Sequence, residues 1–549
     1  MKRVIIFTLG LLGVLVLAGC GNKTGTTAST AGTTAPITFT FYNADAAEDY
    51  PFTDPIARRI TELTGVTLAV DHPVAGDTQT LSLMIASGVY PDLIYAKGDL
   101  SALIEADAVI PLDDLIEKRG KNLKKLYGDQ IVRLRNSSDD PHIYNFGTYG
   151  VKTAIWSTDG SVQIQHAVLK DQGYPRIQTL ADYENAIRNY IRKYPTINGQ
   201  KTLGLSLLID TWQWLIDLGN PANYLIGYPD DGQWIIDQST LEAQYKFLHP
   251  NMELYFKWLN RMNAEGLLDP ESFTQKEDEW KAKIAAGRVL GIAYPLWGYA
   301  DARTSLINEG QEDRTYAILP VVADARFSSP MMKDYGFGGG WGIAISTACK
   351  DPERAFDFID WMCSEEAQIL VNWGLEGVNY NVVDGIRVVP PEEQHYKDTD
   401  TDYGKKTGVG RWSYPFPQFG RGYIDSTGNY ITTDSPETIK QNYLPVEKET
   451  LAAYGVDMWI DLFPSSESLG VSRHGQAWQY TLSPELNAKI TEADDYSKTT
   501  IANLILGRPA DFDAGWAKFM TGLRDIGIEE ANRALTAMVK DKITLWGGN

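Results

Sequence analysis

Hydrophobic residues alternate with threonines over residues 37–41, the pattern of a half-buried β-strand. Residues 54–65 follow as a helix, since an Asp-Pro pair opens the segment, apolar positions recur three or four residues apart, and a glycine closes it. The next strand is expected over 66–70, a second helix around 81–85, and a third strand over 91–96. This alternation predicts a parallel sheet whose ligand site lies in the loops after the first and third strands.

Later segments continue the mixture of strands and helices. The pattern predicts a helix over 253–266, a helix over 351–363 that opens with Asp-Pro, and strands over 289–294, 316–321 and 341–346. From about residue 392 to 433 the chain is polar and rich in glycine with aromatic insertions, which indicates an elaborated loop region. We find no internal repeat.

The N-terminus carries an export signal. Lys2 and Arg3 precede an apolar run over 4–17, which is too short to span a bilayer stably. The tetrapeptide Leu-Ala-Gly-Cys that ends at Cys20 resembles the bacterial lipobox, in which the cysteine becomes the lipidated first residue of the mature chain. We therefore expect a signal peptide over 1–19 and a lipid anchor with a flexible, Thr-rich tether over 20–36.

The chain is long and acidic. At 549 residues and 43% hydrophobic content it can bury more than one core, so two or more lobes are expected. The formal charge of −21 becomes −23 once Lys2 and Arg3 leave with the signal peptide. A field of this sign repels nucleic acid and anionic lipid head groups, so nucleic acid is excluded as a partner and lipid is reached only through the anchor.

Motifs for metal, redox or nucleotide chemistry are absent from the sequence. None of the six histidines is paired at helical metal spacing, and there is no Cys-x-x-Cys, Gly-x-Ser-x-Gly or Walker loop. Cys349 and Cys363 would lie about 18 Å apart at the two ends of one helix, so they are expected to be free, buried cysteines. Residues 398–402 begin like a calcium loop but lack its glycine and its final glutamate. We expect no cofactor, and calcium is doubtful.

Aromatic residues carry more information, with 15 Trp and 29 Tyr in the chain. Sugar rings stack their apolar faces on flat aromatic side chains, and acidic or amide groups bind the hydroxyls at their edges. Most of these aromatics are expected in the core, but an aromatic at a strand end beside Gly or Pro is well placed for a ligand. This criterion selects Tyr95, Trp297, Tyr299 and Trp341, to which we add Trp212 from the aromatic-rich middle of the chain.

Several segments resemble one protein family. Residues 372–380 are similar to its Gly-x-Glu-Gly-x-x-Tyr signature, and further similarity covers the lipobox and residues 256–271, 349–366 and 522–529. The chain thus resembles the extracellular solute-binding proteins of family 1, in particular the LipO-like lipoproteins of carbohydrate ABC importers. The resemblance extends over nearly the whole mature chain.

The resemblance implies an α/β protein of two lobes, a type II periplasmic-binding-protein-like fold. Each lobe would be a mostly parallel sheet flanked by helices, with hinge strands between the lobes. On this basis we expect one lobe over 37–150 and 316–372, and the other over 151–315 and 373–549 with an insertion at about 385–435.

The resemblance also implies ligand-binding residues. The loops after the first and third strands would contribute Asn43, Asp45, Tyr95 and Lys97, and Trp297 matches an aromatic that stacks on sugar. Where the chain recrosses the hinge, the same comparison gives Glu376 and Tyr380. Alginate-binding members carry an acidic calcium loop, but the matching stretch here, residues 194–204, has no acidic ligand, which argues against calcium and alginate.

Together these patterns predict a monomeric, lipid-anchored, non-enzymatic binding protein. It would capture an oligosaccharide between its lobes and deliver it to the permease subunits of an ABC transporter. The expected location is the outer face of a single-membrane cell, or the periplasm where there are two membranes. One alternative is a secreted, lipid-anchored carbohydrate-active enzyme, a lyase or glycosidase, although no catalytic motif supports it. Another is a binding protein for a peptide or other polar solute.

Overall fold

A computed structural model of the chain describes residues 35–45, 51–74, 79–158, 160, 162–480 and 482–547. The expected signal peptide, Cys20 and nearly all of the tether lie outside these ranges. Within the described residues, no helix is both long and apolar enough to cross a membrane.

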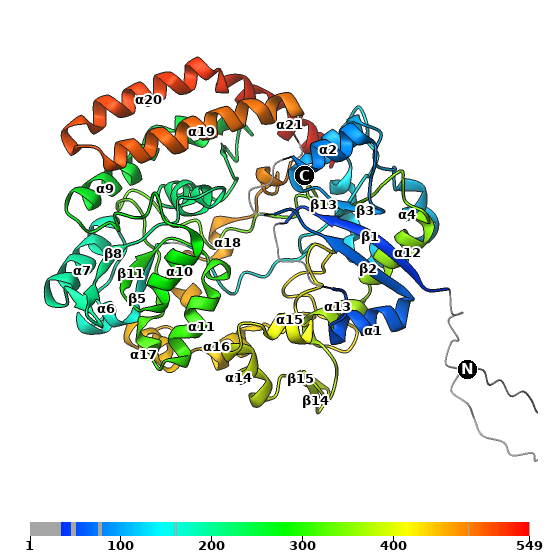
Figure 1. The fold of residues 1–549 in the computed structure, drawn as a ribbon, viewed down its shortest axis with the longest axis horizontal. Coiled ribbons are helices and arrows are strands. Elements are labelled where there is room, and N and C mark those ends of the chain that lie inside the picture. Colours follow the sequence, from blue (N-terminus) through cyan, green and yellow to red (C-terminus); the bar gives the residue numbers. More distant parts are fainter. Residues whose placement is uncertain are drawn as a thin grey trace, which may run out of the picture.

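Two separate sheets, each covered by helices, form two lobes that stand side by side (Figure 1). The first lobe is built on a five-stranded sheet in the order β2-β1-β3-β13-β4. Its strands are β1 (Ile37–Asn43), β2 (Val66–Asp71), β3 (Leu93–Tyr95), β4 (Phe146–Gly147) and β13 (Gly342–Ile345). Its helices are α1 (Pro55–Thr64), α2 (Thr80–Ser87), α3 (Leu100–Glu105), α4 (Asp113–Arg119), α5 (Lys121–Tyr127), α12 (Pro352–Met362) and α13 (Glu365–Trp373).

Local signals set the first elements where the sequence predicts them. Asp54 accepts a hydrogen bond from the Ala57 N–H at 2.8 Å and caps α1, and Gly65 ends that helix with φ 68°. Phe39 and Phe41 of β1 point into the core, as the alternation predicts. Asp351 caps α12, and the free cysteines Cys349 and Cys363 are buried, as expected.

The second lobe is built on a four-stranded sheet in the order β12-β5-β11-β8. Its strands are β5 (Gln163–Gln165), β8 (Leu203–Leu205), β11 (Val289–Ile292) and β12 (Tyr316–Ile318), with two hairpins, β6–β7 (Thr196–Ile197, Gln200–Lys201) and β9–β10 (Trp234–Ile236, Ala243–Tyr245). Its helices are α6 (His166–Asp171), α7 (Leu180–Lys193), α8 (Asn220–Tyr224), α9 (Glu253–Ala264), α10 (Glu277–Ala285), α11 (Ala300–Asn308), α16 (Pro436–Asn442), α17 (Pro445–Tyr454), α19 (Pro484–Leu506), α20 (Phe512–Ile526) and α21 (Ile528–Leu545).

The fold class expected from the sequence is confirmed, but the strand directions differ from a mostly parallel sheet in the second lobe. β1, β2 and β3 are parallel, whereas β5 is antiparallel to both β11 and β12. β13 is likewise antiparallel to β3 and β4. The reason is topological, because β5 and β13 each follow a crossing between lobes and enter the sheet at the edge where its parallel strands end.

The chain leaves and enters the lobes at points that differ from the expected boundaries. β12, at 316–318, pairs with β5 and so belongs to the second sheet, not to the first lobe. Residues beyond 373 remain with the first lobe, since Trp412, Phe416 and Ile431 are buried in its core. Local patterns do not reveal such long-range packing. After its first crossing between the lobes, which precedes β5, the chain crosses again near residues 335 and 435.

Within the segment between those crossings, residues 381–407 form an appendage along the lower edge of the molecule in Figure 1. It contains the β14–β15 hairpin (Asn381–Val383, Ile386–Val388), α14 (Pro391–Thr399) and α15 (Tyr403–Thr407). Asn308 of α11 donates a hydrogen bond to the Thr399 carbonyl at 3.1 Å, so this appendage also reaches the second lobe.

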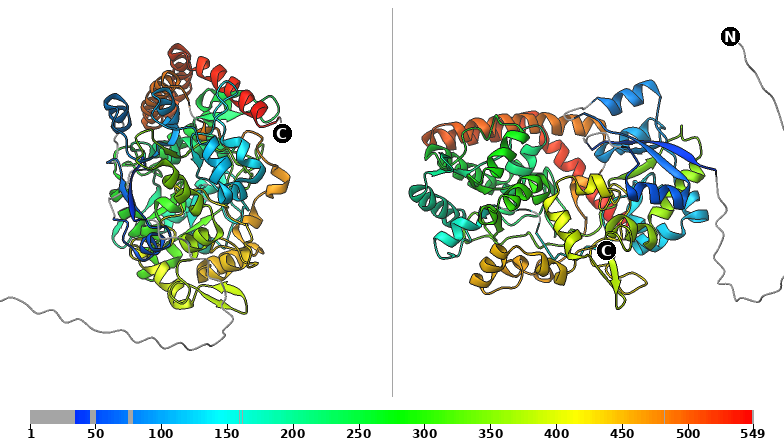
Figure 2. Two further views of the ribbon diagram at one scale, coloured as in Figure 1. Left: turned by 90° about the vertical axis from the view of Figure 1, so that its right-hand side faces the viewer. Right: turned by 60° about the horizontal axis from the view of Figure 1, so that its bottom comes forward.

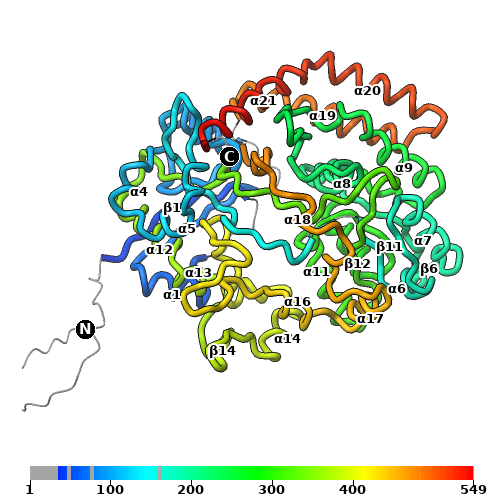
Figure 3. Tube along the Cα trace, turned by 180° about the vertical axis from the view of Figure 1, so that it is seen from behind, coloured from blue at the N-terminus to red at the C-terminus, as the bar shows by residue number. Residues whose placement is uncertain are grey.

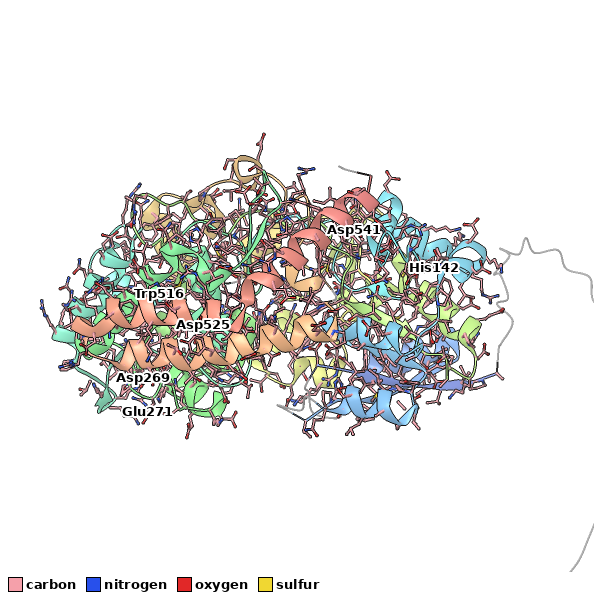
Figure 4. The ribbon with its side chains drawn as sticks, turned by 90° about the horizontal axis from the view of Figure 1, so that it is seen from above. His142, Asp269, Glu271, Trp516, Asp525 and Asp541 are labelled. Carbon is pink, nitrogen blue, oxygen red and sulfur yellow. The ribbon has the colours of Figure 1, made fainter. Side chains whose placement is uncertain are left out.

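The three C-terminal helices cover one side of the second lobe, where α19 and α20 run along its upper surface in Figure 2. The chain reaches them through α18 (Ser466–Leu469), which Figure 3 shows between the two lobes. The end of α21 then reaches the first lobe, as the position of Asp541 in Figure 4 shows. There Lys542 donates hydrogen bonds to the carbonyl oxygens of Arg135, at 2.8 Å, and Asn136. One helix therefore connects both lobes.

A polar network lies inside the second lobe between α19 and the β9–β10 hairpin. Asp494 accepts hydrogen bonds from the Tyr245 hydroxyl at 2.7 Å and the Gln233 amide at 3.1 Å, and burial raises its pKa to about 6. The fully buried Lys246 donates to the Asn220 side chain at 3.1 Å, and its desolvation lowers its pKa to about 8.

This network predicts a pH dependence of stability. The pKa of Asp494 is about 6 in the folded chain and ordinarily 3.8, so between these values the folded state holds a proton that the unfolded chain has lost. The free energy of unfolding should therefore fall as pH rises from about 4 to 6, by roughly 3 kcal/mol at most. The free energy of unfolding of Asp494→Asn, measured with urea, should not show this fall with rising pH. The exposed neighbour Asp495 supplies a control, since Asp495→Asn should keep the fall in the free energy of unfolding. Equal pH profiles of this free energy for wild type and Asp494→Asn would contradict its assignment to Asp494.

Candidate ligand site

Four of the predicted residues meet where β1 and β3 end. Asn43 and Tyr95 are paired in register, and the Asn43 side chain accepts a hydrogen bond from the Asp45 N–H at 3.1 Å. Asp45 forms an ion pair with Lys97, whose backbone is left-handed with φ 52°. The Lys97 ammonium group also lies 5.9 Å from the ring centre of Trp341. The loops after the first and third strands thus come together as the sequence predicts.

Next to this ion pair, five aromatic side chains form a contiguous cluster that we call the aromatic wall. The hydroxyl groups of Tyr95 and Tyr414 contact one another, and the Tyr149 ring lies 6.1 Å from that of Tyr414. Trp478 packs edge-on against Tyr149 at 5.2 Å and against Trp341 at 4.8 Å. These distances are typical of favourable aromatic pairs. The wall therefore consists of Tyr95, Tyr149, Trp341, Tyr414 and Trp478.

Three members of the wall, Tyr149, Tyr414 and Trp478, are not among the residues selected from the sequence. Tyr149 follows the short strand β4 and precedes Gly150, so the strand-end criterion would have found it had β4 been recognised. Trp478 carries no such local signal, because it comes from the stretch between α18 and α19, far from most of the others in sequence. Long-range packing alone brings it to the wall.

The polar atoms of the wall are hydrogen-bond donors. Burial raises the pKa of Tyr95, Tyr149 and Tyr414, and the negative charge of Asp45 adds to each shift, so all three hydroxyls stay protonated at neutral pH. The indole N–H groups of Trp341 and Trp478 are buried and have no acceptor among the described residues. Buried donors without a partner are costly, so an acceptor that reached them would be held firmly.

The wall also touches the second lobe. A β-carbon on Gly232 would lie only 2.6 Å from that of Trp478, so the turn before β9 packs directly on the indole. In the same turn, the Asp230 N–H donates to the Tyr335 hydroxyl at 3.2 Å, and the Asp230 carboxylate accepts from Asn220 at 3.1 Å. The wall therefore lies where both lobes and the crossing segments meet.

A second aromatic group stands at the carboxyl ends of the parallel strands β8 and β11. The rings of Trp212 and Trp297 are nearly parallel, at 20°, with centres 6.0 Å apart, and Tyr294 packs edge-on against Trp297. Trp212 is 49% exposed and Trp297 58%, and no other tryptophan in the described residues is exposed. The predicted pair is thus together and open to solvent, while most other aromatics form core, as expected.

Charged side chains hold this tryptophan pair in position. Gln213 donates to Glu277 at 3.3 Å, Glu277 pairs with Lys281 at 2.7 Å, and Lys281 also pairs with Asp301 at 3.2 Å. This chain of contacts ties the residue after Trp212 to the helix after Trp297. Lys498 adds support by donating to the backbone carbonyls just before Trp212.

Three of the predicted ligand-binding residues lie away from both aromatic groups. Tyr299 is buried, and its hydroxyl donates to Gln163 at 2.7 Å, which places it in the core of the second lobe instead of on its surface. Glu376 is exposed on a turn closed by a hydrogen bond from the Gly377 N–H to the Tyr380 carbonyl, and Tyr380 packs on Trp373. This turn leads into β14, at the lower edge of Figure 1 and away from β1 and β3.

The stretch that matches the calcium loop of alginate-binding relatives folds differently here. Residues 194–204 contain the β6–β7 hairpin, whose two-residue turn, Asn198-Gly199, has φ of 51° and 76°. In the acidic loop at 398–402, Lys406 is bound to the Asp400 carboxylate. Across the described ranges, no three His, Cys, Asp or Glu side chains gather in a way that could hold a metal ion.

The two-lobed architecture, with aromatic groups at the strand ends of both lobes, defines the class of periplasmic-type binding proteins. The sequence pattern of the bacterial extracellular solute-binding proteins matches residues 56–387. The chain belongs to this family. It is 25% identical over 404 residues to the fructooligosaccharide ABC transporter substrate-binding protein FusA of Streptococcus pneumoniae, covering 68% of this chain and 71% of that one. It is also 25% identical over 393 residues to lipoprotein LipO of Bacillus subtilis, covering 68% and 73%.

Solved structures agree on the fold. The alginate-binding protein AlgQ2 without calcium ion superposes with a TM-score of 0.65 at 16% identity, over 92% of this chain and 99% of that chain. FusA of S. pneumoniae in complex with kestose gives a TM-score of 0.64 at 17% identity, over 92% and 99%. A further structure in this group is of a FusA EF-hand mutant in complex with fructo-nystose, with a TM-score of 0.63 at 18% identity.

The hairpin at 194–204 predicts that stability does not depend on calcium. A resident ion would stabilise the folded state, and its removal would lower the melting temperature by several degrees. We expect the melting temperature to change by less than about 1 °C when EDTA is added or when calcium is restored. A fall with EDTA that calcium reverses would show a metal site that the described residues do not reveal.

Proposed function

We propose that this protein is the lipid-anchored substrate-binding component of an ABC importer, and that it captures an oligosaccharide between its lobes for delivery to the permease. The observation that carries this proposal is the exposed, nearly parallel Trp212–Trp297 pair at the strand ends of the second lobe. Flat aromatic faces open to solvent suit the apolar faces of sugar rings. The Asn43, Asp45 and Tyr95 group supplies polar partners for hydroxyls from the first lobe.

The relatives support a sugar as the ligand. By their names, FusA binds fructooligosaccharides and AlgQ2 binds alginate, and each shares the two-lobed fold. The lipobox at Cys20 supports attachment to the membrane, on the outer face of a single-membrane cell or in the periplasm. We propose that the protein acts as a monomer, tethered near its permease by the segment 20–36.

Binding energy would come from closure of the lobes. A ligand that contacts the tryptophan pair on one lobe and the aromatic wall beside the other stabilises the closed state over the open one. No bond in the sugar is broken, so the ligand is handed on intact. A carbohydrate-active enzyme would instead need a catalytic pair facing one bond, and relatives with this fold are solute-binding proteins.

Truncation of the tryptophan pair tests the ligand site. Trp297→Ala and Trp212→Ala should each weaken oligosaccharide binding by roughly 1–3 kcal/mol, about 5- to 150-fold, because each removes a stacking face. Titration calorimetry measures the change. Tyr194→Ala is the matched control, since Tyr194 is also exposed but lies on the β6–β7 side of the lobe. Unchanged affinity in both tryptophan variants would remove the pair from the site.

The class of function is tested by a thermal-shift screen of the mature domain against plant and microbial oligosaccharides. A bound sugar raises the melting temperature by mass action, and mass spectrometry of each positive sample shows whether the sugar survives. We expect stabilising oligosaccharides to be recovered intact. Fragments in place of the added sugar would favour the enzyme, and stabilisation by peptides alone would favour the other alternative.

A further inference from the structure

The cation closest to the aromatic wall is already neutralised. Lys97 lies against the face of Trp341, but its ammonium group is in an ion pair with Asp45. A lysine held in this way has little capacity left for a carboxylate of a ligand, because binding one would mean giving up the other.

Two carboxylates lie beside the wall. Asp45 follows β1 next to Tyr95 and Lys97, and Asp230 stands in the turn whose Gly232 packs on Trp478. Burial raises the pKa of Tyr95 and Tyr414, and the negative charge of Asp45 raises it further. The wall therefore has carboxylates beside it and is lined by neutral hydroxyl and indole donors.

The lysines around the tryptophan pair of the second lobe are also bound to acceptors of the protein itself. Lys276 pairs with Asp210 at 2.9 Å, and Lys281 is shared between Glu277 and Asp301. Lys498 points at backbone carbonyls. In the described part of the chain, no arginine forms a hydrogen bond or a cation–π contact with any residue of either aromatic group. Arginine is the side chain best shaped to bind a carboxylate with two hydrogen bonds.

From this arrangement we propose that the ligand is an uncharged oligosaccharide and that the site discriminates against uronic-acid polymers; this inference rests on the proposed function. A uronate carboxylate placed against the wall loses its hydration, finds Lys97 already paired with Asp45, and lies near the Asp230 carboxylate. Neutral hydroxyls lose much less hydration free energy and feel no charge repulsion, and they can accept from the tyrosine and indole donors.

The test compares sugars that differ only in charge. Oligogalacturonides and oligomannuronates are measured by calorimetry beside their carboxyl-reduced forms, which keep length and linkage while replacing each carboxylate by a hydroxymethyl group. For each scaffold that binds, we expect the neutral form to bind at least about tenfold more tightly at low salt. Equal or tighter binding of a uronate would overturn the inference and leave the proposed function standing. Failure of every oligosaccharide in this set and in the thermal-shift screen to bind would overturn both.

A single substitution tests whether the Asp45–Lys97 pair causes the preference for uncharged sugars. Asp45→Asn removes one carboxylate and frees Lys97, so the affinity for the acidic form relative to the neutral form should rise by about tenfold. Asp114→Asn changes the net charge by the same amount on the exposed surface of α4, where the side chain is 88% exposed, and should leave this ratio unchanged. A ratio that is equal in the two variants would show that the Asp45–Lys97 pair does not set the charge preference.

Discussion

The site depends on how the chain passes between lobes. The first two crossings each enter the new sheet at the edge where neighbouring parallel strands end, which makes β5 and β13 antiparallel to those neighbours. The same constraint places the crossing segments beside the loops that follow β1 and β3. Tyr149 and Trp341 lie next to such segments, and Trp478 lies on the stretch after α18 that runs between the lobes, so the aromatic wall is a consequence of the topology and not of one local motif.

Close packing of the crossing segments explains the glycine run at 338–340. A β-carbon on Gly340 would lie 1.6 Å from the Gln479 carbonyl oxygen, and one on Gly339, at φ 71°, would lie 2.3 Å from the Arg133 carbonyl oxygen. Only glycine lets these backbones approach so closely. The segments that carry Trp341 and Trp478 are thereby held side by side, and the two indoles can pack edge to face.

The sequence allowed prediction of elements with local signals, such as α1 between Asp54 and Gly65. It did not reveal β5, because Gln163 and Gln165 are buried there and their amides donate to the carbonyls of Tyr294 and Gly287, so no hydrophobic alternation marks the strand. Within Trp297-Gly298-Tyr299, one turn exposes the tryptophan and buries the tyrosine, a difference that spacing cannot show. The second and third crossings depend on contacts between distant residues, and they too escape local patterns.

The measurement that tests this account most directly is a crystal structure of the mature domain with a stabilising oligosaccharide. The account predicts one intact sugar chain between the lobes, stacked on Trp212 or Trp297 and hydrogen-bonded at the same time to the Asn43–Tyr95 side of the first lobe. A sugar bound to one lobe alone, on another face of the molecule, or cleaved within the site would contradict it.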